Sequence, residues 1–196
     1  MRILALGDSF TQGYLVECNN YTRFLTKAGF EIINFGINGS TSSDMVKRYE
    51  KIKNKYKNVD YLIIFGGSND FLNGQSVNLA YSNVKSILNL STARKNIIII
   101  PPLIEEEDSY PIYGYVNEKI NEFAKKLLDF DCLKVDSRKI KPYYLDGLHM
   151  GKIFHEKLAC EILKIIEDDI NEWIRRYRKY WQDGCKELSF TRFYAK

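Results

Sequence analysis

This chain has no closely spaced cysteine pair and no long apolar stretch, and each absence argues against a class of protein. Its four cysteines are widely spaced and include no C-x-x-C pair, which disfavours a zinc site and a redox-active dithiol. No apolar run approaches the roughly 18 residues of a membrane-spanning helix, and the few apolar residues after Met1 and Arg2 are too few for a signal peptide. We therefore expect a soluble, cytoplasmic protein with reduced thiols and no transmembrane segment.

The length and composition are those of one globular domain with a charged tail. A chain of 196 residues buries roughly 70% of its unfolded surface, so it needs neither a metal nor a disulfide to fold. The net charge of +4 arises entirely at the C-terminus, because residues 1–170 hold 22 basic and 22 acidic side chains, whereas residues 171–196 hold 7 and 3. We expect one domain over residues 1–170 and a basic, aromatic extension over residues 171–196.

Five short apolar runs alternate with helical patterns along the chain. The runs cover residues 3–6, 31–35, 61–65, 97–100 and 133–135. The connections between them have helical spacing and a length that suits right-handed crossovers between parallel strands. The alternation predicts an α/β protein, a three-layer α/β/α sandwich around a five-stranded parallel sheet.

Local signals place the ends of the predicted helices. Gly29 is expected just after a helix over residues 21–28, and Ser42 or Ser43 is expected to cap the next helix. Residues 11–14 and 66–70 are predicted as loops of small and polar residues. The last helix is expected to begin near residue 152.

Three of the strand exits carry small, polar residues that chemistry can use. Gly7-Asp8-Ser9 follows the first strand, Gly39 follows the second and Asn69 follows the third. The carboxyl ends of parallel strands open at one edge of a sheet, so Ser9, Gly39 and Asn69 are predicted to share a crevice. Taken alone, a Gly-Asp-Ser turn is more often only a strand exit.

A fourth block, Asp-Gly-Leu-His at residues 146–149, follows the fifth strand. A carboxylate three residues before an imidazole on a turn can accept its Nδ1–H, so Asp146 would hold His149 with Nε2 facing outward as a base. Ser9 is a weak nucleophile until a base takes its proton, and His149 is the candidate. His155, the only other histidine, is expected to be a surface or packing residue.

Acyl transfer also needs hydrogen-bond donors for the oxygen that becomes negative in the tetrahedral intermediate. Three donors are available at the predicted edge: the N–H of Ser9, the N–H of Gly39 and the side-chain amide of Asn69. Singly, Gly39 and Asn69 would each be read as turn residues. Their value lies in the combination with Ser9 and His149.

Taken together, these four blocks resemble those of the GDSL, or SGNH, esterase and lipase family, over about residues 1–166. The resemblance implies that Ser9 is the nucleophile, His149 the base and Asp146 its partner, with Ser9, Gly39 and Asn69 as the oxyanion hole. It also implies a flavodoxin-like sheet of strand order 2-1-3-4-5 and a small, open site. Phe10 stands where the family name would place leucine. The absence of G-x-S-x-G argues against an ordinary α/β-hydrolase.

The leading interpretation is a serine esterase that hydrolyses small acyl esters, such as O-acetyl or short-chain acyl groups on carbohydrates. It would act through an acyl-enzyme, with no cofactor and no metal, on a small-molecule ester substrate. The same family leaves a lysophospholipase and an acyl-CoA thioesterase open, and a non-catalytic module that binds acylated glycans or another small ligand is the alternative from another class. A metal held by Asp146 and His149 lacks a third ligand at suitable spacing.

An acidic run, Glu105 to Asp108, leaves the fourth strand at the same edge of the sheet. Most such runs are merely solvated. If this one faces the pocket, like-charge repulsion disfavours strongly anionic substrates such as acyl-CoA.

The C-terminal extension continues the apolar spacing of the last helix. One helix from about Lys152 to Trp181 would be roughly 45 Å long, so it either breaks near residues 167–169 or projects. Residues 186–194 alternate as a strand would. We expect residues 171–196 to pack on their own domain or on a second copy in a homodimer. The extension also holds a basic cluster of Arg175, Arg176, Arg178 and Lys179. Such a cluster could instead bind nucleic acid or an anionic membrane. Charges on the solvent-exposed side of a helix need no ligand, however, and no nucleic acid partner is expected.

Overall fold

The computed structural model describes residues 1–106 and 112–182, with side chains up to residue 175. Five parallel strands form one sheet in the order β2-β1-β3-β4-β5. The sequence-based prediction of an α/β sandwich with this strand order is therefore confirmed. The strands are β1 (Arg2–Gly7), β2 (Glu31–Gly36), β3 (Tyr61–Phe65), β4 (Lys95–Ile100) and β5 (Leu133–Asp136).

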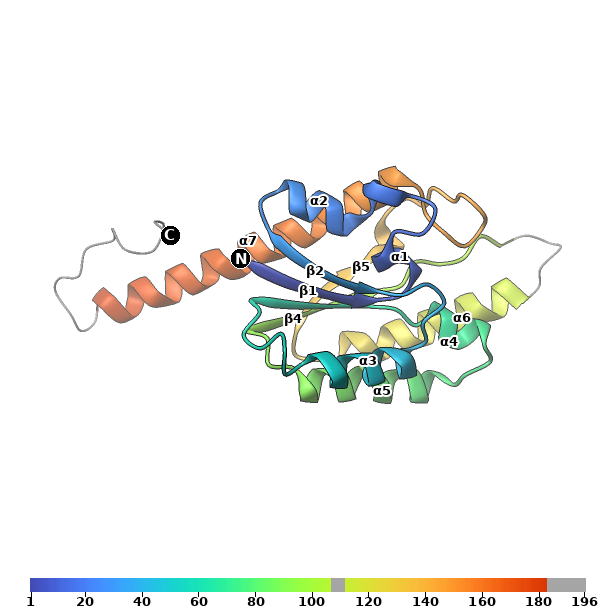
Figure 1. Ribbon diagram of the computed structural model, residues 1–196, viewed down its shortest axis with the longest axis horizontal. Helices are drawn as coiled ribbons and strands as arrows, with labels where there is room; N and C mark the ends of the chain where they lie inside the picture. Colours follow the sequence, from blue (N-terminus) through green and yellow to red (C-terminus); the bar gives the residue numbers. More distant parts are fainter. Residues whose placement is uncertain (107–111, 183–196) are drawn as a thin grey trace. The chain divides into compact units, whose positions relative to one another are not determined.

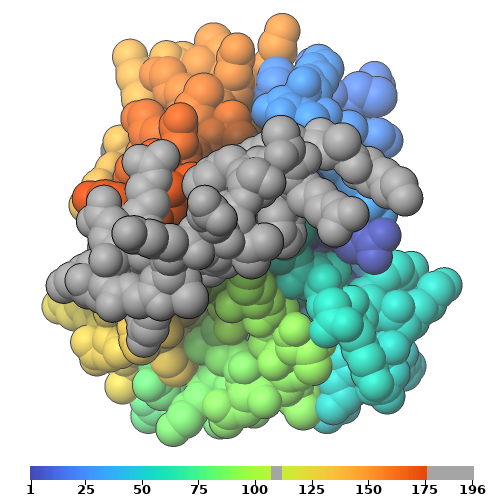
Figure 2. Space-filling view, turned by 90° about the vertical axis from the view of Figure 1, so that its left-hand side faces the viewer, coloured from blue at the N-terminus to red at the C-terminus, as the bar shows by residue number. Residues whose placement is uncertain are grey.

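Helices cover both faces of the sheet. In Figure 1, α2 and the first turns of α7 lie on one face, and α3, α5 and α6 lie on the other. Figure 2 shows the same two layers from the end where the strands begin, with α2 in blue, α3 in teal and α5 in green. The helices are α1 (Ser9–Gln12), α2 (Tyr21–Lys27), α3 (Ser42–Ile52), α4 (Ser68–Leu72), α5 (Val77–Leu90), α6 (Ile112–Leu128) and α7 (Lys152–Gln182), with short 3-10 turns at Glu17–Asn19 and Ser137–Lys139.

The core follows from the alternation of side chains along each strand. Leu4, Leu62 and Ile98 point to one face and belong to a continuous apolar cluster with buried residues of α3, α5 and α6. Their neighbours Ile3 and Ile63 point to the other face and are also fully buried. Because both faces of the sheet are covered, its central strands read as unbroken apolar runs in the sequence.

The register of the sheet aligns three strand ends. Gly7 at the end of β1 pairs with Gly36 at the end of β2 and with Phe65 at the end of β3. The segments that follow these strands therefore leave the sheet at one level and one edge. This alignment brings Ser9, Gly39 and Asn69 to one end of the molecule.

Three local predictions are wrong in detail. Thr41, rather than Ser42 or Ser43, caps α3, since its hydroxyl accepts the N–H of Asp44 and the Asp44 carboxylate accepts the N–H of Thr41. The expected loops over residues 11–14 and 66–70 hold the short helices α1 and α4. Both helices are only one turn long, which leaves no apolar periodicity from which to predict them.

The chain divides into two compact units, Met1–Ile162 and Leu163–Lys196. The boundary lies within α7, which is continuous, so a break near residues 167–169 does not occur. The division predicted between residues 170 and 171 and the packing of residues 171–196 stay predictions, and the strand expected over residues 186–194 lies outside the described residues. Within the described ranges, none of the helices combines the length and apolarity needed to cross a membrane.

Candidate active site

Ser9 lies two residues after Gly7, a position where only glycine fits. A Cβ on Gly7 would lie 2.1 Å from Thr11 Oγ1 and 2.6 Å from the carbonyl oxygen of Phe65, so the chain has no room there for a larger residue. Asp8 then caps α1, because its Oδ1 accepts the N–H of Phe10 at 3.1 Å. Ser9 is therefore held at the first position of a helix, at the carboxyl edge of the sheet.

The structure places Ser9, His149 and Asp146 in a line. His149 Nε2 lies 3.0 Å from Ser9 Oγ, and His149 Nδ1 lies 2.7 Å from Asp146 Oδ2. With Nδ1–H donated to the carboxylate, Nε2 is left as the acceptor for the serine hydroxyl. This is the arrangement in which an imidazole takes the proton of a nucleophilic serine.

Asp146 is held by its own turn. Its Oδ1 accepts the backbone N–H of Leu148 at 3.1 Å and that of His149 at 2.6 Å. Burial raises the pKa of this carboxyl, but the hydrogen bonds from His149 and Leu148 outweigh it and bring the pKa of Asp146 below its ordinary value. Asp146 is thus a fixed carboxylate rather than a mobile one.

The candidate oxyanion donors come from the next two strand exits. Gly39 has a φ of +72°, in a turn that the N–H of Ser40 closes on the carbonyl of Ile37 at 3.2 Å. A Cβ on Gly39 would meet no atom within 4 Å, so the space beside this residue is open. Asn69 lies in α4, and its Nδ2 donates one hydrogen bond to the carbonyl of Ser40 at 3.0 Å. The amide carries a second hydrogen that can serve an oxyanion.

A buried charged cluster lies beneath the nucleophile turn, and the sequence interpretation missed it. Burial raises the pKa of Asp8 to about 7, against opposing effects of the Phe10 N–H and the Arg48 charge. Burial also raises the pKa of Asp70, whose carboxylate accepts the N–H of Ser42 at 2.8 Å. A signal in the sequence was Arg48, whose position in α3 falls among the core residues Met45, Tyr49 and Ile52.

His155 is buried rather than exposed, so only the packing half of the expectation for this residue holds. Its ring stacks on Tyr21, with ring planes 9° apart, and its Nδ1 accepts the N–H of Tyr21 at 3.4 Å. Burial lowers the pKa of His155 to about 4, which keeps the imidazole neutral. The ring of His155 also packs against the ring of Phe10, and the centroid of the Phe10 ring lies 6.0 Å from that of His149.

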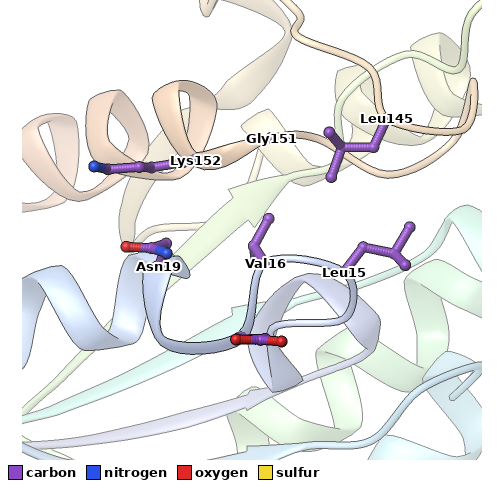
Figure 3. A pocket seen from close by; sticks show the side chains of 7 residues that line it. Leu15, Val16, Asn19, Leu145, Gly151 and Lys152 are labelled. Atoms are coloured by element: carbon purple, nitrogen blue, oxygen red, sulfur yellow. The ribbon is translucent and has the colours of Figure 1, made fainter.

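A shallow groove of about 310 Å³ lies beside Leu145, the residue before Asp146. Figure 3 shows Leu15 and Leu145 facing each other at one end and Asn19 and Lys152 at the other. Leu145 directly precedes Asp146, and Leu15 and Leu145 are each about half exposed. The groove is lined by Leu15, Val16, Glu17, Asn19, Leu145, Gly151 and Lys152.

The first part of the acidic run lies against the Asp146 turn. The N–H of Glu105 donates to the carbonyl of Gly147 at 2.8 Å. Burial raises the pKa of the Tyr144 hydroxyl, and the negative charges of Glu105 and Glu106 raise it further. The remainder of the run, Glu107 and Asp108, lies outside the described residues. Within residues 1–106 and 112–175, no group of three or more histidine, cysteine, aspartate or glutamate side chains is arranged to hold a metal ion.

Comparison with known proteins shows the family of the chain. The model of the GDSL-like lipase/acylhydrolase family matches residues 5–157. No curated protein matches the chain at a significant level. Among solved structures, a lipase/acylhydrolase from Enterococcus faecalis is 25% identical, with a TM-score of 0.69 over 86% of this chain and 96% of that one.

Two more distant structures share the fold. An aryl esterase from M. smegmatis is 17% identical, and a carbohydrate acetylesterase from Sinorhizobium meliloti is also 17% identical; each gives a TM-score of 0.73 over 85% of this chain and 98% of its own. The fold is that of an α/β/α sandwich protein with a five-stranded parallel sheet. The chain belongs to the GDSL-like lipase/acylhydrolase family, and it is a carboxylic ester hydrolase.

Proposed function

We propose that this chain hydrolyses small, neutral acyl esters through an acyl-enzyme on Ser9. The observation that carries the proposal is the continuous hydrogen-bonded line from Ser9 Oγ through His149 to Asp146, with steps of 3.0 and 2.7 Å. The mechanism uses protein groups and water only.

In the acylation half, Ser9 Oγ attacks the ester carbonyl while its proton passes to His149 Nε2. The imidazolium that forms keeps its Nδ1–H on Asp146, which stabilises the positive charge. The tetrahedral intermediate collapses when the carbon–oxygen bond to the alcohol breaks, and His149 returns the proton to the leaving oxygen. The alcohol departs and the acyl group stays on Ser9.

In the deacylation half, water replaces the alcohol. His149 Nε2 takes a proton from water as the water oxygen attacks the acyl carbon. The second intermediate collapses when the bond from the acyl carbon to Ser9 Oγ breaks, and His149 returns the proton to Ser9 Oγ, which releases the carboxylic acid and restores the free serine. In both halves the carbonyl oxygen becomes negative beside the N–H groups of Ser9 and Gly39 and the amide of Asn69. We assign these three groups as the oxyanion hole.

The experiment that tests this proposal compares wild type with Ser9→Ala. Hydrolysis of p-nitrophenyl acetate should fall by roughly 10⁴-fold or more, because the nucleophile is lost while the hole remains. A fluorophosphonate should add to Ser9 of wild type, as intact-protein mass spectrometry would show, and should leave the variant unmodified. A wild-type protein inert to both reagents would instead favour a module that binds acylated glycans or another small ligand.

For the substrate we propose O-acetyl or other short-chain acyl groups, on carbohydrates in the first instance. Among the fold neighbours, one is named a carbohydrate acetylesterase and another an aryl esterase. The shallow groove supports this choice, because it pairs apolar Leu15 and Leu145 with polar Asn19 and Lys152. A panel of acetyl, butyryl and octanoyl esters tests it, and faster turnover of the octanoyl ester would contradict it.

The lysophospholipase alternative is tested by the acyl-chain panel, whereas the acyl-CoA thioesterase alternative requires a strongly anionic substrate. Glu105 lies against the turn that carries Asp146, so its charge should repel such a substrate at low ionic strength. We expect the neutral ester p-nitrophenyl acetate to be insensitive to salt and acetyl-CoA to be a poor substrate that improves as salt is added. Faster hydrolysis of acetyl-CoA at low salt would reject the neutral-ester assignment while leaving the esterase chemistry intact.

A further inference from the structure

Ser40 connects the two loops that carry the candidate oxyanion donors. It directly follows Gly39, and its N–H closes the Gly39 turn on the carbonyl of Ile37 at 3.2 Å. Its carbonyl accepts the side-chain amide of Asn69 at 3.0 Å. One buried residue therefore fixes both the turn at Gly39 and the direction of the Asn69 amide.

The side chain of Arg48, in α3, contacts Ser40. Its Nη1 donates to Ser40 Oγ at 3.0 Å, and its Nη2 donates to the carbonyl of Gly7 at 2.7 Å. Gly7 ends β1, two residues before Ser9, and its carbonyl also accepts the N–H of Ile37 at 3.1 Å. A single guanidinium thus bridges the nucleophile turn and the Gly39–Ser40 turn.

The chemistry of arginine suits this bridge. The guanidinium is a planar, rigid fork whose two terminal nitrogens set a fixed spacing between two acceptors, whereas a lysine ammonium is a single point on a flexible stem. The buried Nε–H of Arg48 has no hydrogen-bond partner, which costs free energy. The side chain is therefore oriented so that Gly7 and Ser40 are both reached, at the expense of its third donor position.

A simple ion pair with the acidic groups nearby does not explain the orientation. Asp44 and Asp8 both act on Arg48 by charge, and both act against the burial that lowers the pKa of the guanidinium. The hydrogen bonds of Arg48, however, go to a backbone carbonyl and a serine hydroxyl rather than to a carboxylate. Charge accounts for the tolerance of a buried arginine at this place, and the two hydrogen bonds account for its orientation.

We propose that Arg48 is a positioning residue of the oxyanion hole. Because it links Gly7 to Ser40, Arg48 keeps three donors directed at the position of the oxyanion: the N–H of Ser9, the N–H of Gly39 and the amide of Asn69. The inference rests on the proposed function, in which Ser9 is the nucleophile. In this proposal Arg48 and Ser40 affect the reaction without contacting the substrate.

The expected effect follows from where the donors act. They bind the oxyanion of the transition state more strongly than the ester carbonyl, so a loss of alignment lowers kcat and leaves KM little changed. Displacements of about 1 Å cost up to about 100-fold in rate. We expect Arg48→Met to lower kcat by roughly 10- to 100-fold, Arg48→Lys to recover only part of that, and Ser40→Ala to lower kcat roughly tenfold.

The experiment measures kcat and KM for p-nitrophenyl acetate, with the concentration of competent sites titrated by a fluorophosphonate. The variants are Arg48→Met, Arg48→Lys, Ser40→Ala and the double variant. The control is Lys47→Met, the exposed neighbour of Arg48 on α3. Affinity for a boronic acid that mimics the tetrahedral intermediate is measured alongside and should weaken in step with kcat/KM, which a merely structural role would not produce.

A double-mutant cycle decides whether the two residues act together. If Arg48 works through Ser40, the double variant should be no worse than Arg48→Met alone. Additive losses, or a kcat per titrated site within twofold of wild type in both single variants, would overturn the proposal. If Arg48→Met fails to fold, Ser40→Ala and Arg48→Lys carry the test. A wild type without Ser9-dependent activity would mean instead that the proposed function has failed.

Discussion

Tyr14 lies against the imidazole of His149, with ring centroids 4.7 Å apart and ring planes inclined by 57°. Its side chain is 40% exposed, so the ring covers the histidine from the solvent side. Aromatic contacts of this kind contribute about 0.5–1.5 kcal/mol. We expect Tyr14→Ala to lower kcat/KM by roughly 2- to 10-fold, and Tyr14→Phe to stay near wild type. Steady-state kinetics measure both, with Tyr115→Ala on α6 as an exposed-tyrosine control, and equal losses in Ala and Phe would refute a role for the ring.

Asp146→Asn should separate orientation from binding. An asparagine amide would donate to Nδ1 of His149 and favour the tautomer whose Nε2 carries the proton, so His149 could no longer take the proton of Ser9. We expect kcat to fall by about 10⁴-fold with the melting temperature nearly unchanged. Turnover of p-nitrophenyl acetate and a thermal melt provide the two readouts. A variant with more than a tenth of wild-type kcat would show that Asp146 is not the partner of the base.

Asn69→Ala removes the one side-chain donor assigned to the oxyanion. The loss of such a donor costs about 10²- to 10³-fold in kcat, and KM should change little because the donor acts mainly in the transition state. Asn73, exposed at the end of the same short helix, offers a matched control in Asn73→Ala. Equal kinetics for the two variants would remove Asn69 from the oxyanion hole.

The raised pKa of Asp8 predicts that the stability of the folded protein depends on pH. Its folded pKa of about 7 lies above the ordinary value of 3.8, so the folded protein binds more protons than the unfolded chain between these two values. The contribution of Asp8 to stability is therefore full below about pH 4 and is lost as the pH rises to about 7. Asp8→Asn keeps an acceptor for the Phe10 N–H but does not titrate.

The free energy of unfolding of Asp8→Asn relative to wild type should thus rise by about 1 kcal/mol per pH unit across that window. Urea denaturation at pH 4.5, 6 and 8 measures it. A difference between variant and wild type that is constant with pH would show that Asp8 is ionised throughout.

Truncation after Asp169 tests the expected self-association of residues 171–196. If a second copy packs on this extension, light scattering should show a dimer for the full chain and a monomer for the truncated one. Hydrolysis of p-nitrophenyl acetate should persist, because the assigned catalytic and oxyanion residues all lie within Met1–Ile162. The same molecular mass per particle in both chains, after allowing for the deleted residues, would count against a dimer.

The sheet could be read from the sequence because its causes are local. Central strands buried on both faces appear as apolar runs, and the crossovers appear as helical patterns of sufficient length. The edge strand β2 is less buried than β1 and β3, yet its run of apolar residues still marked it. What local pattern could not supply were the one-turn helices α1 and α4 and the choice of Thr41 as the cap of α3. Ser42 is instead the first residue of α3, and its hydroxyl donates to the carboxylate of Asp70 in α4, a contact that only the tertiary structure creates.

The sequence by itself determined which residue types follow each strand, and parallel topology required those strand ends to meet at one edge, which is why Ser9, Gly39, Asn69 and His149 could be named in advance. Only the tertiary structure decided that Arg48 bridges Gly7 and Ser40 and that Tyr14 covers His149. These contacts depend on how α3 and the loops pack on the sheet. A single sequence does not show such packing, because it does not show which residues will be the neighbours of a given tyrosine or arginine.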